Sequence, residues 1–360
     1  MKRRQFMSSS LLMGAGLILS NSSLGNLAFA NTAQAALNQR KIGDLSVHPI
    51  GLGCMSMVGV YNPRQPKDAM VRLIAQAVDN GVDFFDTAEV YGPHYSEEIV
   101  GEGLKPYRNR VKIASKFGFD FSGNRSSNRN ASPSHVRTAV EGMLQRLQVE
   151  TIDLCYLHRL DSDTPIEDTA GVVGELINEG KIRNFGLSEV SPEIIRRAHA
   201  VQPVAALQSE YSIVERVMEH DILPLCEELG IAFVPWGPLC RGMLSGRFDE
   251  NYIPEAGYRR AGVPYFTPQA LKTNLKMVDF LKELGQRKNA TPAQIALGWL
   301  LAQKPFIIPI PGTTNPEHLM ENIGAMNIQF SQAELIEIRQ GIEDIKLIGF
   351  REPQSVFVNL

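Results

Sequence analysis

The feature that most restricts the fold of this chain is an eightfold alternation of short β-rich runs with helical patterns. The runs cover residues 47–53, 82–88, 111–117, 152–158, 182–188, 204–210, 231–237 and 306–312. Between them, apolar residues recur at helical spacing, and several stretches open on a Ser-Pro or Thr-Pro pair, which is typical of a helix N-terminus. Strict alternation predicts the α/β class and a single (β/α)₈ TIM barrel over residues 40–346, followed by a tail at 347–360.

A doubly wound sheet is the alternative arrangement. It requires a glycine-rich phosphate turn directly between the first strand and a helix. Residues 51–56 (GLGCMS) match that turn only in part, because Ser56 stands where the third glycine belongs and because Pro63 and Pro66 interrupt the stretch where the helix should run. The barrel therefore remains the prediction.

The first 30 residues have the layout of an export signal. Arg3 and Arg4 precede an apolar run at 11–19, and small-residue cleavage motifs stand at 28–30 and 33–35. The run would form a helix of only about 14 Å, against a bilayer core of about 30 Å, so we expect no permanent membrane span. The sequence predicts a twin-arginine signal peptide at 1–30, cleaved after residue 30 or 35, recognition by the twin-arginine translocation machinery and a periplasmic location.

The charge and the cysteine and histidine spacing exclude several function classes. The net charge is −3, and cleavage after residue 30 removes three basic and no acidic residues, which gives −6. Without a basic stripe, small molecules are better partners than nucleic acid. The four cysteines lack C-x-x-C spacing and the seven histidines lack H-x-x-x-H or H-E-x-x-H spacing, so we expect free buried thiols and no metal site.

Polar side chains stand at the ends of neighbouring predicted strands. Asp86, Lys116 and His158 end the second, third and fourth strands, and Tyr91 comes after Asp86 by a short turn. Because the carboxyl ends of barrel strands meet at one mouth, we expect these four side chains to lie together. An ammonium group held charged by a carboxylate can lower the pKa of a phenol, which would let Tyr91 give a proton to a carbonyl oxygen.

The order Asp, Tyr, Lys, His and the segments FFDTAEVYG, IASKFG, YLHR and LQSEYS resemble the aldo-keto reductase family, and the resemblance covers about residues 40–345. In that family the tyrosine is the general acid, the lysine and aspartate tune it, and the histidine orients the substrate carbonyl. The resemblance implies these roles for Tyr91, Lys116, Asp86 and His158. It also implies reduction of aldehydes or ketones to alcohols with NADP(H), with NAD(H) as a possible cofactor.

Two other functions stay open at this point. One is a nicotinamide-nucleotide-binding sensor or accessory subunit on the same barrel, with weak or no catalysis. The other is a barrel hydrolase that uses Asp86 and Glu89 as paired carboxylates, although it leaves Lys116 without a role.

The cofactor residues are predicted partly from chemistry and partly from the resemblance. Hydride donation needs a wall for a flat ring, a group that fixes the carboxamide and a phosphate cradle. Residues at the ends of strands five to seven can supply the first two, and the segment after strand eight lies where barrels commonly bind phosphate. The candidates are Ser188, Glu189, Gln208, Trp236, Gly237, Pro238, Leu239, Arg241, Gly312, Thr313, His318, Glu321 and Asn322.

This chain departs from the family pattern at several of these positions. The family usually has Asn where Glu189 stands and Tyr where Trp236 stands. The Lys and Arg that meet the 2′-phosphate in many relatives are Asn315 and His318 here, so we expect a modest preference for NADP that grows as pH falls toward 6 and His318 is protonated. Arg241 is expected to approach the diphosphate or the 2′-phosphate instead.

Overall fold

The computed structural model describes residues 39–123 and 128–349. The predicted signal peptide lies outside the described residues, as does the predicted tail from residue 350 onward. Ile348 is still held by the barrel, because it exchanges hydrogen bonds of 2.8 and 2.9 Å with the Asn274 side chain. Within the described ranges, no helix combines the length and the apolar character that crossing a membrane would require.

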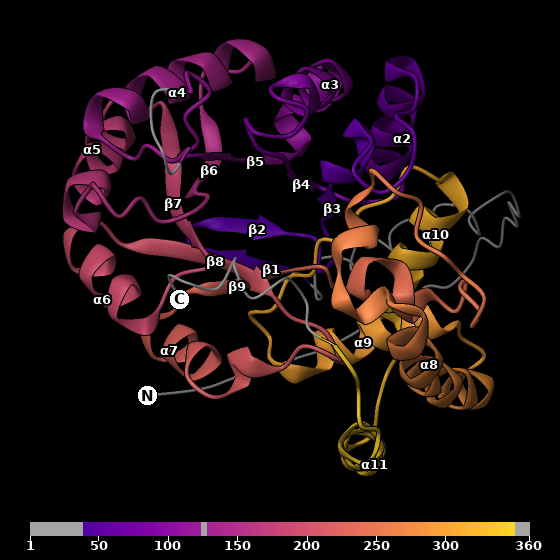
Figure 1. Cartoon of the computed structure of the whole chain (residues 1–360). Coiled ribbons are helices and arrows are strands. Elements are labelled where there is room, and N and C mark those ends of the chain that lie inside the picture. The colour runs from indigo at the N-terminus through magenta and orange to yellow at the C-terminus, as the bar shows by residue number, and fades with distance from the viewer. Residues whose placement is uncertain (1–38, 124–127, 350–360) are drawn as a thin grey trace, which may run out of the picture. The chain divides into compact units, whose positions relative to one another are not determined.

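Seven parallel strands form one sheet in which each strand pairs with the next along the chain. They are β3 (Leu52–Gly53), β4 (Phe84–Asp86), β5 (Lys112–Phe117), β6 (Ile152–Leu157), β7 (Ile182–Ser188), β8 (Val204–Glu210) and β9 (Ala232–Trp236). Helices surround these strands (Figure 1) and are α2 (Lys67–Asp79), α3 (Tyr95–Leu104), α4 (Pro133–Leu147), α5 (Ile166–Asn178), α6 (Pro192–Val201), α7 (Ile222–Leu229), α8 (Pro268–Lys288), α9 (Pro292–Gln303), α10 (Pro316–Gly324) and α11 (Gln332–Asp344).

The eighth predicted strand is replaced by an extended segment that closes the barrel without a regular ladder. The carbonyls of Pro309 and Pro311 accept from the amides of Gly51 and Gly53, while amides of the same segment donate to β9 carbonyls on its other side. Pro309 and Pro311 have no N–H, so the segment cannot form regular strand pairing. The prediction of a regular strand at 306–312 was wrong, but the segment holds the eighth position of a (β/α)₈ barrel.

Two further elements differ from expectation. The first predicted run divides, because β2 (Leu45–Val47) pairs antiparallel with β1 (Arg40–Ile42) and only β3 joins the barrel. Apolar residues recur at helical spacing over 216–229, but α7 begins only at Ile222, after a short 3₁₀ turn at Val217–Glu219. Pro224 explains the difference, since proline is tolerated in the first turn of a helix but breaks a helix interior.

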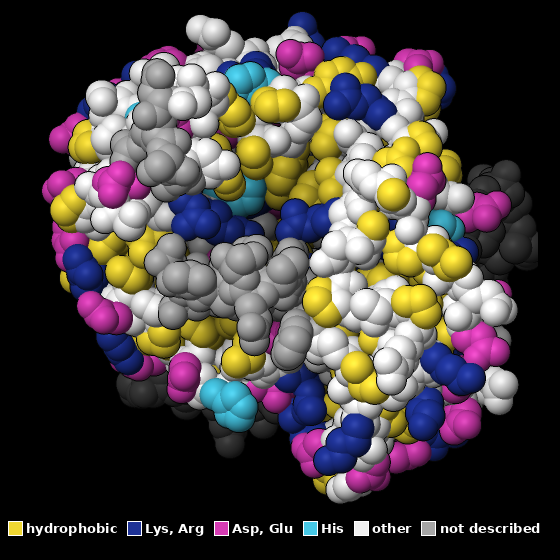
Figure 2. Space-filling view, in the orientation of Figure 1, with side chains coloured by type: hydrophobic (Ala, Val, Ile, Leu, Met, Phe, Trp, Pro, Cys, Tyr) yellow, Lys and Arg dark blue, Asp and Glu magenta, His cyan; other side chains and the backbone are white. Residues whose placement is uncertain are grey.

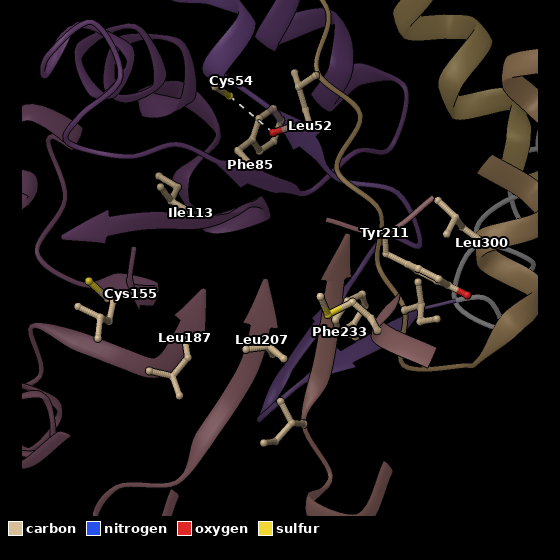
Figure 3. Close-up of a cluster of buried hydrophobic side chains, with 14 of the residues drawn as sticks. Leu52, Cys54, Phe85, Ile113, Cys155, Leu187, Leu207, Tyr211, Phe233 and Leu300 are labelled. Atoms are coloured by element: carbon tan, nitrogen blue, oxygen red, sulfur yellow. Dashed lines mark hydrogen bonds between the residues drawn. The ribbon is translucent and has the colours of Figure 1, made fainter. Parts of the chain in front are cut away.

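The side chains of the barrel strands alternate between two cores. Outward side chains pack against the helices, as Figure 3 shows for Phe85, Ile113, Cys155, Leu187 and Leu207. Inward side chains fill the barrel together with residues of the β1–β2 hairpin, and they include Phe84, Ala114, Leu154, Tyr156, Ala206 and Val234. All four cysteines are free and buried.

Candidate active site

The pleat of the strands explains why the predicted catalytic residues meet. Inward-facing positions inside the barrel are occupied by Phe84, Ala114 and Tyr156. Because side chains two positions apart lie on the same face of a strand, Asp86, Lys116 and His158 also point inward, one step nearer the carboxyl ends of the strands. Tyr91 joins them from the turn after β4. The structure thus brings together all four residues that the sequence singled out.

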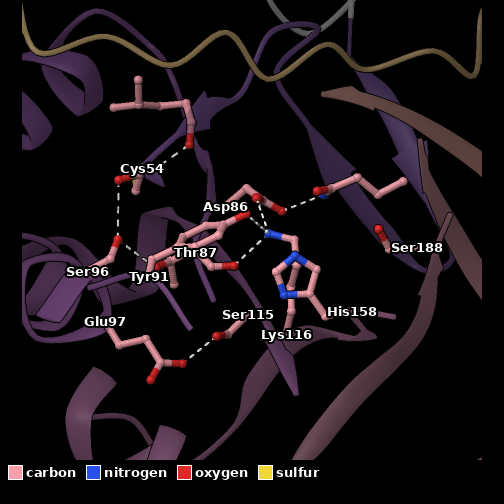
Figure 4. A network of polar contacts seen from close by, with 12 residues as sticks. Cys54, Asp86, Thr87, Tyr91, Ser96, Glu97, Ser115, Lys116, His158 and Ser188 are labelled. Atoms are coloured by element: carbon pink, nitrogen blue, oxygen red, sulfur yellow. Dashed lines mark hydrogen bonds and ion pairs between the residues drawn. The ribbon is translucent and has the colours of Figure 1, made fainter. Parts of the chain in front are cut away.

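Lys116 is the centre of the network in Figure 4. Its side chain is fully buried, and its Nζ donates to the Asp86 carboxylate, to the Thr87 carbonyl oxygen at 2.7 Å and to the Tyr91 phenol oxygen at 3.3 Å. Gln208 donates to the other Asp86 oxygen at 2.8 Å. A lysine ammonium has three N–H groups and no acceptor. Each of the three therefore has a partner, and Tyr91 receives a hydrogen bond through its oxygen.

The protonation states differ in part from the prediction. Burial alone lowers the pKa of Lys116, but Asp86 and Tyr91 outweigh it and raise the pKa above its usual value, so the ammonium stays charged. Burial raises the pKa of Tyr91, and the charge of Lys116 lowers it by less. The net pKa of Tyr91 lies above its usual value, contrary to the expected lowering. Tyr91 is consequently a protonated phenol, which is the form that can donate.

His158 contributes a neutral imidazole beside the phenol. Its ring meets the Tyr91 ring edge to face at 5.7 Å between centroids and the Phe119 ring at 5.2 Å. Burial, followed by the positive charges of Arg159 and Lys116, lowers the pKa of His158 well below its usual value. Its buried Nδ1 has no hydrogen-bond partner among the described residues.

The structure places some of the residues predicted to bind the nicotinamide as expected and places Glu189 differently. Ser188 and Gln208 are buried at the ends of β7 and β8, as expected. Glu189 instead has a left-handed backbone with φ of 53°, and its Oε1 accepts 2.8 Å hydrogen bonds from the Glu210 amide and from Nε1 of Trp236. Glu189 therefore fixes the orientation of the Trp236 ring, a contact that the sequence did not predict.

Arg241, which the sequence suggested as a phosphate contact, forms a buried ion pair with Glu210. Its guanidinium donates to both carboxylate oxygens of Glu210 at 2.7 and 3.2 Å, and both side chains are buried. It also lies 5.3 Å from the centroid of the Trp236 ring. Burial acts against its charge, but Glu210 outweighs it and raises the pKa of Arg241. The long-range pair with Glu210 was not visible in the sequence.

The turn after β9 and the segment before α10 occupy the expected places. Gly237, with φ of 64°, Pro238 and Leu239 connect β9 to a 3₁₀ turn at Cys240–Ser245. Gly312 and Thr313 precede α10, whose N-cap Asn315 accepts from the amides of Glu317 and His318. The first amides of α10 are thus already bonded to a side chain, which limits how many remain for a phosphate.

A basic residue missed by the sequence reasoning lies at α10. Arg247 forms an ion pair with Glu321. Burial, followed by the charge of Arg247, lowers the pKa of His318, so His318 is neutral at a lower pH than expected. Asn322 is buried in the same helix. The signal available in the sequence was the second arginine of the segment RGMLSGR, where only Arg241 was considered.

The arrangement of Glu89 does not support a hydrolytic carboxylate pair. Its Oε1 accepts from the amides of Gly118 at 3.0 Å and Phe119 at 3.1 Å, while Asp86 binds Lys116. Glu89 therefore holds the start of the loop that carries Phe119. Across the described ranges, no group of three or more His, Cys, Asp or Glu side chains is placed to hold a metal ion.

Known proteins share this sequence and fold. The sequence pattern of the aldo/keto reductase family matches residues 49–343. "Probable aldo-keto reductase 1" of Glycine max is 42% identical over 313 residues, which are 86% of this chain and 90% of that protein. Among solved structures, a glycerol dehydrogenase from Gluconobacter oxydans superimposes with a TM-score of 0.78 at 31% identity, covering 86% of this chain and 95% of that one.

A second structure links the fold to a bound nucleotide. An aldo/keto reductase from Klebsiella pneumoniae, solved in complex with NADP and acetate, has a TM-score of 0.68 at 26% identity and covers 84% of this chain and 94% of that one. The family match spans most of the barrel. The sequence identity to the Glycine max protein is higher than a shared fold alone would require. By sequence and by structure, this chain belongs to the aldo/keto reductase family of oxidoreductases.

Proposed function

We propose that this protein reduces aldehydes or ketones to alcohols with NADP(H), and that Tyr91 is the proton donor. The observation that carries the proposal is the saturated ammonium of Lys116. All three of its N–H groups have acceptors, and one acceptor is the Tyr91 oxygen. The Tyr91 proton must then point to another acceptor, and a substrate carbonyl oxygen is such an acceptor.

The surrounding groups favour proton transfer in the direction of reduction. As Tyr91 loses its proton, a negative charge grows on the phenol oxygen, 3.3 Å from Nζ of Lys116. A buried ammonium stabilises that charge without reorganisation. His158 is neutral, so it can offer a ring N–H to the carbonyl oxygen without adding a second positive charge beside Lys116.

The residues of this chain fit a nicotinamide nucleotide. When bound, the cofactor supplies the hydride that the carbonyl carbon receives. Trp236 offers an aromatic wall whose orientation Glu189 fixes, and the buried Ser188 and Gln208 at the ends of β7 and β8 can bind the carboxamide. The Klebsiella pneumoniae relative solved with NADP supports the choice of cofactor.

For the far end of the cofactor we propose the residues around α10. Gly312 and Thr313 would approach the phosphates, and His318, Glu321 and Asn322 would hold the adenosine. Arg247 would add the positive charge that a 2′-phosphate requires, because it stands beside Glu321 and acts on His318.

The test replaces Tyr91 with Phe. Carbonyl reduction should fall by at least about 100-fold, because proton donation acts in the transition state, while NADPH binding, measured by nucleotide fluorescence, should stay the same. Tyr107→Phe is the matched control, since Tyr107 lies in the 3₁₀ turn at Lys105–Arg110 that precedes β5, before the strand enters the barrel. Equal turnover in wild type and Tyr91→Phe would remove Tyr91 as the acid. NADPH binding without turnover of any aldehyde would favour the sensor alternative.

We also propose that the mature protein acts in the periplasm after export by the twin-arginine pathway. The proposal rests on Arg3, Arg4, the short apolar run and the cleavage motif ending at Ala30.

A further inference from the structure

Arg159 comes directly after His158 at the end of β6 and has no part in the proposed proton transfer. Its Nη1 donates to the His158 carbonyl oxygen at 2.6 Å and to the Ser188 hydroxyl at 3.0 Å. These two bonds fix the guanidinium between the proposed carbonyl site and the proposed nicotinamide site. An arginine held in this way has lost most of its conformational freedom before any ligand arrives.

The remaining donor atoms of the Arg159 guanidinium are available to a ligand. Its Nε and Nη2 form no hydrogen bond with a described residue. The Arg159 side chain is half-buried, so it is not fully enclosed by the barrel. A planar guanidinium with donors on one open edge matches the geometry of a carboxylate or phosphate.

Other segments bring positive charge to the same place. Arg129 reaches it from the loop after β5, where its Nη1 donates to the Leu160 carbonyl oxygen at 3.2 Å. Arg259 comes from the segment after β9, whose backbone is bonded to the Val60 carbonyl oxygen. Burial, together with Arg259 and Arg129, lowers the pKa of Arg159, while Glu189 opposes the shift. Figure 2 shows basic side chains bordering the hollow near the middle of this face, beside histidine and apolar side chains.

Converging arginines are costly while the site is empty and favourable once an anion is present, because like charges repel and a ligand charge of opposite sign relieves the repulsion. Glu189 acts on the pKa of Arg159 in the opposite direction, and its Oε1 accepts hydrogen bonds from Nε1 of Trp236 and from the Glu210 amide.

We infer that the natural substrate is an aldehyde or ketone that carries an anionic group, a carboxylate or phosphate, a few bonds from its carbonyl, and that Arg159 binds that group. The inference rests on the proposed function, since it names the substrate class of the same site. Tyr91 then meets the carbonyl oxygen while the open edge of Arg159 holds the anion. Arg159 thus determines specificity and takes no part in proton transfer.

The experiment compares kcat/KM for matched pairs of anionic and neutral substrates. The carboxylate pair is 4-oxobutanoate with butanal, and the phosphate pair is phosphoglycolaldehyde with glycolaldehyde. Wild type should prefer the anionic member of at least one pair by about 10- to 100-fold, the range expected for a charge-assisted fork, and the preference should shrink as salt rises. The pair that shows the larger preference identifies carboxylate or phosphate as the source of the charge.

Arg159→Met should abolish the preference by raising KM for the anionic substrates far more than KM for their neutral partners. Arg159→Lys should retain part of the preference, because it keeps the charge but loses the fork. Arg72→Met, which removes an exposed ion pair on α2, is the matched control for lost charge. Butyrate should inhibit butanal reduction competitively in wild type, a measurement that needs no variant to fold.

The outcomes separate this inference from the proposed function. If wild type reduces butanal and glycolaldehyde without preferring their anionic partners, the inference fails and the proposed function stands. If Arg159→Met lowers turnover of neutral and anionic substrates equally, Arg159 does not determine charge specificity. If no aldehyde of either class is reduced in the presence of NADPH, the proposed function itself fails.

Discussion

Replacing Lys116 with Met should destabilise the protein far more at pH 8 than at pH 5.5. Methionine is close to lysine in length and apolar, so it fills much of the same space without a charge. The substitution leaves Asp86, which is only 2% exposed, with the Gln208 amide as its remaining side-chain donor. A buried carboxylate that has lost its cation then governs the stability of the variant.

The magnitude is set by the burial of the pair. Removing one partner of a buried ion pair typically costs about 3–5 kcal/mol when the remaining charge stays ionised. Asp86 can avoid part of this cost by taking up a proton. In the variant, the pKa of Asp86 in the folded state would lie above its unfolded value of about 3.9. The folded state then binds more protons than the unfolded state between these two pKa values, so stability falls as pH rises through that range. Each pH unit in that window changes stability by about 1.4 kcal/mol.

Urea unfolding of wild type and Lys116→Met at pH 5.5 and pH 8.0 measures the effect. We expect the stability gap to widen by about 2–3 kcal/mol between the two pH values. Adding Asp86→Asn to Lys116→Met should recover part of the loss at pH 8.0, because the stranded charge is gone. Lys67→Met is the control, since the Lys67–Glu102 pair is 37% and 52% exposed and should contribute less than about 1 kcal/mol. Parallel loss at both pH values, or no recovery in the double variant, would refute the reasoning.

Three further predictions concern other parts of the chain. Burial raises the pKa of Glu89 to about 7, so the contribution of Glu89 to stability is present at acid pH and is lost as pH rises from about 4.3 to about 7. In urea unfolding, Glu89→Gln should reduce the change in unfolding free energy across this pH range by up to about 3 kcal/mol. An unchanged pH profile would contradict this prediction. Because burial and Arg247 lower the pKa of His318, the ratio of the NADPH dissociation constant to the NADH dissociation constant should stay constant between pH 8 and pH 6. Arg247→Met should weaken NADPH binding about tenfold more than NADH binding, and a ratio that falls between pH 8 and pH 6 in wild type would restore His318 as the residue that binds the phosphate. Replacing Arg3 and Arg4 with Lys should leave the unprocessed precursor in the cytoplasm, and processed protein in the periplasm of that variant would exclude the twin-arginine route.

The architecture and the four central residues could be predicted from the sequence because both depend on local periodicity. The alternation of β-rich and helical runs depends only on the residue types within short stretches of the chain. A polar side chain two positions after an inward-facing one lies on the same face of its strand. Asp86, Lys116 and His158 therefore lie close together once their strands are parallel neighbours. The departure at 306–312 was also local in origin, since Pro309 and Pro311 are visible in the sequence and remove the amides that a ladder needs.

Only the tertiary structure decided the electrostatics and the long-range pairs. Burial determines the direction of the pKa shift of Tyr91, and burial is a property of everything packed around the phenol, which sequence spacing does not contain. The ion pair of Arg241, in the turn after β9, with Glu210 at the end of β8 is one such long-range contact. The fixed guanidinium of Arg159 beside Ser188 arises in the same way, because β6 and β7 become neighbours only after the barrel forms. Contacts between residues distant in sequence depend on the whole fold, and for that reason the sequence revealed which groups react but not which partners hold them.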